Sequence, residues 1–431
     1  MERRRFIRNT AVAAGGIALG PAFWSQLFAG EAAASGTGSC LVQRVRRPYG
    51  PLQRADANGI RLPEGFTSRV VAITGENVPG TTYLWHRAPD GGACFVVPGG
   101  GGDYVYVSNS EVVQAAGGGA SAVRFSPCGA VRRVPDPRRH EHQLRWRADT
   151  VGHVAVRRGV RRRTGVECDP FRPSQGVARP ALGFYAHEAA AVDPVYGHVY
   201  LTEDRPDGRL YRFKPAAYPD LSAGRLQVAR VVAGGSVVPV ATDVLEGTIQ
   251  WVTVSNGTTG AVMPRPANTT AFRGGEGIWF DHGHIYFTTK GDNRVWRLTT
   301  SSRHLCVMYD DDLVEGAPLR GVDNVVVNRA GEVFVAEDGD NMQLHVIREA
   351  CTVGPLLQIV GQDGSEITGP AFSPGEAACT SARNAVPTAS SPASRMRCEG
   401  PSAAPADGSG DRPSTAGPDD RAQYDGSPSP S

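Results

Sequence analysis

Short apolar and β-branched runs that end in acidic residues dominate the pattern of this chain. The clearest runs cover 200–204, 285–293 and 333–339. Each reads as a β-strand followed by a turn. Carboxylates at strand ends can converge on one rim of a closed β-structure, and convergent carboxylates bind hard cations. The pattern therefore predicts a metal centre.

Three longer segments repeat the order apolar run, turn, apolar run, at 189–213, 277–298 and 324–347. Long apolar stretches with helical periodicity are absent from the sequence, and 53 of the 431 residues are glycine. This spacing predicts an all-β fold with tight turns and is typical of the blades of a β-propeller, which bury their faces against one another. An array of β-sandwiches is the alternative that the pattern leaves open.

The N-terminus has the pattern of an export signal. Arg3 and Arg4 precede a mildly apolar stretch at 11–28, and three alanines at 32–34 fit a cleavage site. This order resembles a twin-arginine signal, so we expect residues 1–34 to be a signal peptide recognised by the twin-arginine translocase. The mature protein is then periplasmic or extracellular. No later run is apolar enough to predict a membrane anchor.

Cysteine usage excludes one class of site. None of the eight cysteines stands in a C-x-x-C pair, which argues against a zinc ribbon. Disulfides are compatible with an exported chain. The sequence leaves their pairing open among Cys40, Cys94, Cys168, Cys306 and Cys351.

Three ordered motifs carry a family resemblance. Residues 184–193 lead into 200–204, residues 274–280 into 289–293, and residues 321–324 into 336–339. Over about 45–130 and 165–375 the chain resembles the PhoX-type alkaline phosphatases. The resemblance implies a six-bladed propeller domain at 45–375, exported by the twin-arginine route. It further implies a monomer that hydrolyses small phosphate monoesters at a calcium and iron centre.

The candidate site residues follow from these motifs. Glu188 and Glu276 are the first choices for both metal binding and catalysis. The full set of expected metal ligands is Glu188, Glu203, Asp204, Glu276, Asp292, Asp323, Glu337 and Asp338. Arg273 and Lys290 are candidates for holding a phosphate, since arginine offers a bidentate fork and lysine a point charge. His187 is expected to be a structural histidine, and Tyr200, Tyr286, Trp279 and Trp296 to be blade core.

The segment 132–163 breaks the pattern. It holds eleven arginines against Asp136, Glu141 and Asp149, a local charge of +8 in a chain with a net charge of +2. Nucleic-acid binding is one interpretation, with a steep salt dependence expected. A frameshift fits better, because codons shifted by one nucleotide can encode the loop with Cys, Trp and Glu-Glu that PhoX-type proteins carry here. In those proteins the Cys and a Glu take part in the metal centre. Because the frameshift accounts for the arginines, we predict no nucleic-acid partner.

The C-terminus has a similar signature. After Pro374 the β-pattern is lost, and 378–395 re-read in another frame resembles the closing strand of the family. We therefore expect the domain to end at 375 and residues 376–431 to form a disordered, low-complexity tail. Impaired activity is then an expected consequence. The functional alternatives are a calcium-stabilised propeller that only binds a ligand, and a propeller hydrolase such as a lactonase.

Overall fold

The computed structural model describes residues 41–42, 44–112, 118–131, 165–171, 176–254, 265–339, 341–348, 352–385 and 394–399. All of them belong to one compact unit, residues 1–400. Their regular elements are β-strands and four short 3-10 helices, η3 (Pro180–Leu182), η4 (Ala241–Asp243), η5 (Lys290–Asp292) and η6 (Asp311–Leu313). In these parts of the chain no helix is long and apolar enough to cross a membrane.

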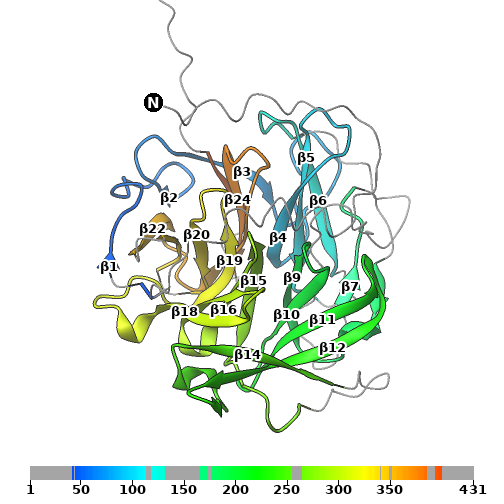
Figure 1. The fold of residues 1–431 in the computed structure, drawn as a ribbon. Coiled ribbons are helices and arrows are strands. Elements are labelled where there is room, and N and C mark those ends of the chain that lie inside the picture. The colour runs from blue at the N-terminus through cyan, green and yellow to red at the C-terminus, as the bar shows by residue number, and fades with distance from the viewer. Residues whose placement is uncertain are drawn as a thin grey trace, which may run out of the picture. The chain divides into compact units, whose positions relative to one another are not determined.

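The described residues form five antiparallel units, called blades one to five below, and blades one to four are each built from strands that are consecutive in the chain (Figure 1). Blade one is β4 (Pro89–Val96), β5 (Tyr104–Ser110) and β6 (Ala120–Phe125). Blade two is β9 (His187–Asp193), β10 (His198–Glu203), β11 (Leu210–Ala217) and β12 (Asp220–Ala233). Blade three is β15 (Gly275–Asp281), β16 (His284–Thr289), β17 (Arg294–Thr299) and β18 (His304–Asp310).

Blades four and five continue the series. Blade four is β19 (Val322–Val327), β20 (Val333–Glu337), β21 (Gln343–Arg348) and β22 (Thr352–Ile359). Blade five is β23 (Ser365–Phe372), β24 (Ala378–Ala385) and β25 (Ser394–Glu399), completed by the early strand β3 (Thr67–Ile73).

The remaining strands lie at the edges of these units. The two-stranded sheet β7 (Gly165–Glu167) and β8 (Val177–Arg179) comes between blades one and two in the chain. β14 (Glu246–Thr253) pairs with β12 and β18, so it joins the last strands of blades two and three. β1 (Arg44–Val45) and β2 (Ile60–Arg61) both pair with β22, and β13 (Ser236–Val237) pairs with β12.

The hydrophobic core is divided into layers between successive blades. The first strands of neighbouring blades pack together in the order β9, β15, β19, β23, β4. Each core layer takes buried side chains from two neighbours: Tyr200 and Ile278, Tyr286 and Val325, Phe334 and Ile367, Tyr104 and Ala371. Both faces of a blade are covered, and all five residues of β20 are accordingly buried. This is the architecture of the predicted all-β propeller.

The last blade is closed by strands from both parts of the chain. β3 pairs with β25, β25 with β24, and β24 with β23, all antiparallel. The expectation that β-structure ends after Pro374 is therefore wrong, since β24 and β25 lie beyond it. Pairing of an early strand with the final one removes a free sheet edge, which stabilises a propeller. Residues 401–431, predicted to be a disordered tail, lie outside the described residues.

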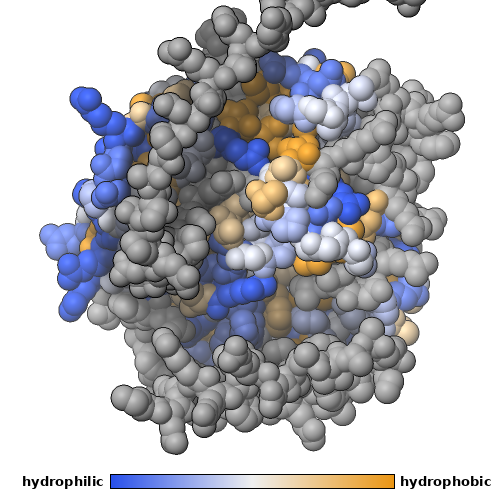
Figure 2. Space-filling model, turned by 90° about the horizontal axis from the view of Figure 1, so that it is seen from above, coloured by the Kyte–Doolittle hydropathy of each residue, from blue (hydrophilic) through white to orange (hydrophobic). Residues whose placement is uncertain are grey.

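Exposed large apolar side chains are dispersed over several blades. Leu84, Tyr196 and Leu313, for example, belong to different parts of the fold. On the face seen from above, hydrophilic and hydrophobic groups of the described residues lie among one another (Figure 2). The notable burial in this protein is instead that of acidic side chains.

Candidate metal centre

An acidic residue is the second residue of the first strand in every blade. These residues are Asp90, Glu188, Glu276, Asp323 and Glu366. All are buried, with at most 7% of the residue exposed. Burial of a carboxylate is costly unless charge or hydrogen bonds compensate it, so buried acids that recur at one strand position in five blades are the candidate site.

A β-bulge explains how these residues leave the strand ladder. In blades one to four, the residue before the acid pairs with the last residue of the second strand, and the register shifts directly after it. The pairs are Pro89 with Ser110, His187 with Glu203, Gly275 with Thr289, and Val322 with Glu337. Each acid therefore falls within the irregularity, where a bulge re-aims a side chain.

Glycine lets the first strands approach one another beside these acids. A Cβ atom at Gly277 would lie 2.7 Å from Asn324 Cα and 2.7 Å from Val325 N. Gly369, at φ +55°, donates its N–H to Asn324 Oδ1 over 2.6 Å. Any larger residue at 277 would separate blades three and four at the point where Glu276 and Asp323 lie.

Three carboxylates gather at blades four and five. Carboxylate oxygens of Asp323, Asp338 and Glu366 all lie within 4.8 Å of one another. Asp338 also forms an isolated backbone bridge with Glu366. Lys290 Nζ contacts Asp338 Oδ2 and lies 3.7 Å from Asp323 Oδ2. Three carboxylates against one ammonium leave a formal charge of −2, and oxygen donors of this kind suit a divalent cation such as calcium.

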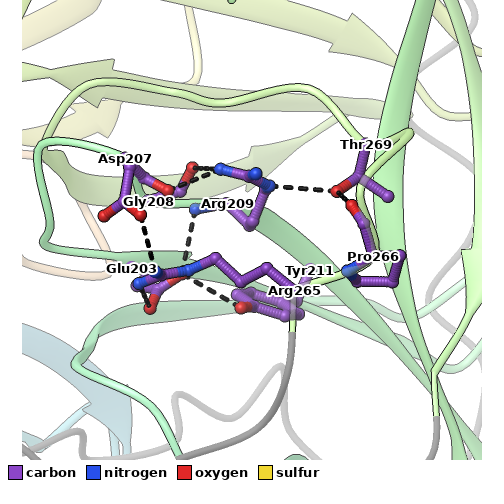
Figure 3. Close-up of polar contacts among 8 residues, drawn as sticks. All are labelled: Glu203, Asp207, Gly208, Arg209, Tyr211, Arg265, Pro266 and Thr269. Carbon is purple, nitrogen blue, oxygen red and sulfur yellow. Dashed lines mark hydrogen bonds and ion pairs between the residues drawn. The ribbon is translucent and has the colours of Figure 1, made fainter. Parts of the chain in front are cut away.

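Glu203 has a different environment (Figure 3). It is 1% exposed, and Arg265 approaches it with Nη2 at 2.5 Å from Oε1 and Nε at 3.2 Å from Oε2. Its Oε2 also accepts from the Arg209 backbone N–H and the Tyr211 hydroxyl, each at 3.0 Å. Burial and the carboxylate raise the pKa of Tyr211, which keeps its hydroxyl a donor. These contacts favour a structural role that ties the segment before blade three to blade two.

Replacing Arg265 with methionine should destabilise the protein by about 3 kcal/mol, because it leaves the Glu203 carboxylate buried without its charge partner. Urea unfolding measures the loss. Arg348→Met is the matched control: its partner Glu332 keeps bonds from Tyr49 and Asn328, and the arginine is 36% exposed. The control should change stability by no more than about 1 kcal/mol. Equal losses in the two variants would contradict the structural role of the Glu203 pair.

Glu337 occupies the same position in blade four as Glu203 in blade two. Its oxygens accept from the backbone N–H groups of Arg320 and Gln343, at 2.9 and 2.8 Å. In both blades the glutamate accepts from the backbone N–H six residues later, Arg209 in blade two and Gln343 in blade four. Each glutamate therefore holds the turn that leads to the third strand. His345 Nδ1 lies 3.5 Å from Glu337 Oε1, and burial lowers the pKa of His345 to about 3.

The other predicted residues, Asp292, Asp204 and Arg273, are not among the five acids. Asp292 accepts from the Thr289 hydroxyl, and burial raises the pKa of Asp292 to about 6. Asp204 is half-buried at the end of blade two's second strand. Arg273 is exposed, and its carbonyl accepts from Gly291 N at 3.0 Å, next to Lys290.

His187 lies beside Glu188 but faces its own blade. It stacks on Tyr185 with ring centroids 3.6 Å apart, and its Nε2 contacts Gly183 O at 3.1 Å. Burial lowers the pKa of His187 to about 4, so the ring is neutral at neutral pH. These contacts agree with the structural role expected from the sequence.

Sequence reasoning missed Asp90 and Glu366. The acids first noted in the sequence follow apolar runs, whereas Asp90 and Glu366 lie at the second position of a strand. For Asp90 a usable signal was an acid followed by small residues, Asp90-Gly-Gly-Ala, as in Glu188-Ala-Ala-Ala, whereas Glu366, followed by Ile and Thr, lacks this signal. The arginine-rich segment 132–163, for which a frameshift was predicted, lies outside the described residues. Cys306 is disulfide-bonded.

The fold is that of a β-propeller whose five described blades each carry a buried acid on the first strand. The profile of the family described as alkaline phosphatase PhoX matches residues 157–385, more than half of the chain. The chain therefore belongs to the PhoX alkaline phosphatase family, and its function is that of a phosphatase.

One solved structure shows the same fold. Pseudomonas fluorescens PhoX in complex with vanadate, a transition-state analogue, has a TM-score of 0.58 at 15% identity, over 84% of this chain and 98% of that one. A luciferin-regenerating enzyme is more distant, with a TM-score of 0.36 at 11% identity, over 78% of this chain and 96% of that one. No curated protein matches the chain.

Proposed function

We propose that this protein hydrolyses small phosphate monoesters at a centre of calcium and iron ions held by the first strands of its blades. The observation that carries the proposal is the set of five buried acids at one strand position, Asp90, Glu188, Glu276, Asp323 and Glu366. Of the ligands expected from sequence, Glu188, Glu276 and Asp323 belong to this set, and Asp338 joins Asp323 and Glu366 in a cluster within 4.8 Å.

The chemistry of these donors fits hard cations. Carboxylate oxygens are the ligands that calcium prefers, and the described set contains no clustered histidines or thiolates that would favour a softer metal. The iron part of the proposal rests on the family resemblance. When bound, the ions supply positive charge that neutralises the nonbridging oxygens of a phosphate.

Charge balance explains why cations are needed for a phosphate to approach. Buried carboxylates repel an anionic ester, and the Lys290 ammonium contacts Asp338 and lies 3.7 Å from Asp323. Its side chain is 31% exposed, so the ammonium can present a point charge to a phosphate oxygen. The Arg273 carbonyl accepts from the Gly291 N–H, and this bond positions the backbone next to Lys290.

The proposal extends to location. The Arg3-Arg4 signal supports export through the twin-arginine translocase, and the disulfide of Cys306 is compatible with an oxidising compartment. Small phosphate esters are the expected substrates, and a monomer is the expected state. Because 132–163 is the segment predicted to be frameshifted, the chain as written is expected to turn over more slowly than a version with the re-read loop.

The test is hydrolysis of p-nitrophenyl phosphate by the purified protein, with its metal content measured by elemental analysis of the same sample. We expect turnover together with bound calcium and iron. Bound calcium without turnover would instead support a calcium-stabilised propeller that only binds. Turnover by protein that contains neither metal would refute the proposed centre.

A further inference from the structure

Two threonines occupy the same place in neighbouring blades. Thr202 and Thr288 are each the next-to-last residue of the second strand, inside the β-bulge that contains the acid of that blade. Both are buried, at 1% and 0% exposure. A buried hydroxyl must find partners, and both find theirs on backbone beside the acids.

Thr202 connects blade two to blade three. Its Oγ1 accepts from the N–H of Ala189, the residue after Glu188, at 3.1 Å. The same hydroxyl donates to the backbone carbonyl of Glu276 at 2.5 Å. The Thr202 side chain therefore fixes the backbone next to Glu188 and the backbone of Glu276 itself.

Thr288 repeats this connection one blade further. Its hydroxyl donates to the backbone carbonyl of Asp323, and its Oγ1 lies 3.4 Å from the carbonyl of Gly277, the residue after Glu276. In blade two the matching distance, from Thr202 Oγ1 to Ala189 O, is also 3.4 Å. The series ends in blade four, where the equivalent residue is Ala336.

We propose that Thr202 and Thr288 are positioning residues for the metal centre, which hold Glu188, Glu276 and Asp323 in one fixed arrangement across three blades. This inference rests on the proposed metal binding. Its physical basis is that a bulge is locally irregular, so the acid's backbone needs a restraint from outside its own ladder. Hydroxyls that bond to carbonyls of the next blade supply that restraint and set the spacing between acids.

The test is calcium titration by calorimetry, with protein first stripped of metal by chelation. Thr288→Val keeps the shape of the side chain and removes the donor. We expect its calcium affinity to fall by about 10- to 100-fold, the usual range for partners that orient metal ligands. Thr288→Ser restores the hydroxyl and should recover most of the affinity. Thr202→Val provides the second test if Thr288→Val does not fold.

Thr270→Val is the matched control. Thr270 is also fully buried, and its hydroxyl donates to the Val238 carbonyl at 2.7 Å, away from the five acids. All three valine variants should lower the melting temperature of the metal-free protein. Only Thr288→Val and Thr202→Val should weaken calcium binding. Wild-type affinity in Thr288→Val and Thr202→Val would overturn the positioning role and leave the metal centre intact. Failure of the wild-type protein to bind calcium would overturn both.

Discussion

The Glu276→Gln variant is expected to lose phosphatase turnover by at least about 100-fold while keeping its fold. Glu276 is 1% exposed and lies between the acids of blades two and four. Glutamine has nearly the same shape but removes one negative charge from the centre. Because loss of an outer partner of a metal ligand already costs about 10- to 100-fold, loss of a ligand should cost at least the upper end of that range.

The measurement is the initial rate of p-nitrophenyl phosphate hydrolysis at saturating calcium, with circular dichroism to confirm the β-fold. Glu246→Gln is the control, since the Glu246 side chain is 75% exposed and pairs only loosely with His304 at 3.5 Å. This control should keep the wild-type rate. Wild-type turnover in Glu276→Gln would remove Glu276 from the proposed centre.

Chelation of divalent cations is expected to abolish turnover and to lower the stability of the wild-type protein. Without bound cations, the carboxylates of Asp323, Asp338 and Glu366 face one another within 4.8 Å, with Lys290 as their compensating charge. A ligand that binds the folded state alone stabilises it by about 2.7 kcal/mol at 100 times its dissociation constant. The melting temperature should therefore rise with calcium concentration.

Thermal unfolding followed at increasing calcium, after treatment with EGTA, measures this effect. Adding calcium back should restore turnover and the melting temperature together. The Glu366→Gln variant should show a much smaller calcium-dependent shift, since it removes one carboxylate from the cluster of Asp323, Asp338 and Glu366. A melting temperature that is independent of calcium in the wild-type protein would argue against a site in the folded centre.

Much of the fold could be predicted from local patterns. Alternating runs and tight turns around 189–213, 277–298 and 324–347 correspond to the strand pairs of blades two, three and four. These elements are local, because a strand and its hairpin partner are separated by a few residues. The closure of blade five was not predictable in this way, because β3 and β25 are more than 300 residues apart in the chain.

The candidate site was only partly predictable. Glu188 and Glu276 were identified, and both lie at the second position of a first strand. Glu203 and Glu337 seemed equivalent to them in sequence, yet each is engaged by backbone N–H groups of a following turn. Glu203 and Glu337 end second strands, whereas Glu188 and Glu276 lie in first strands.

The sequence by itself determined that the chain forms short antiparallel strands, because apolar, β-branched runs and turn residues act over a few positions. It also determined the acidic content of the strand ends. Only the tertiary structure decided which acids meet, because first strands of different blades approach through non-local packing, as at Gly277 against Asn324. Asp90 and Glu366 are separated by 276 positions in the chain. They lie on neighbouring first strands, β4 and β23, because those strands pack together in the fold.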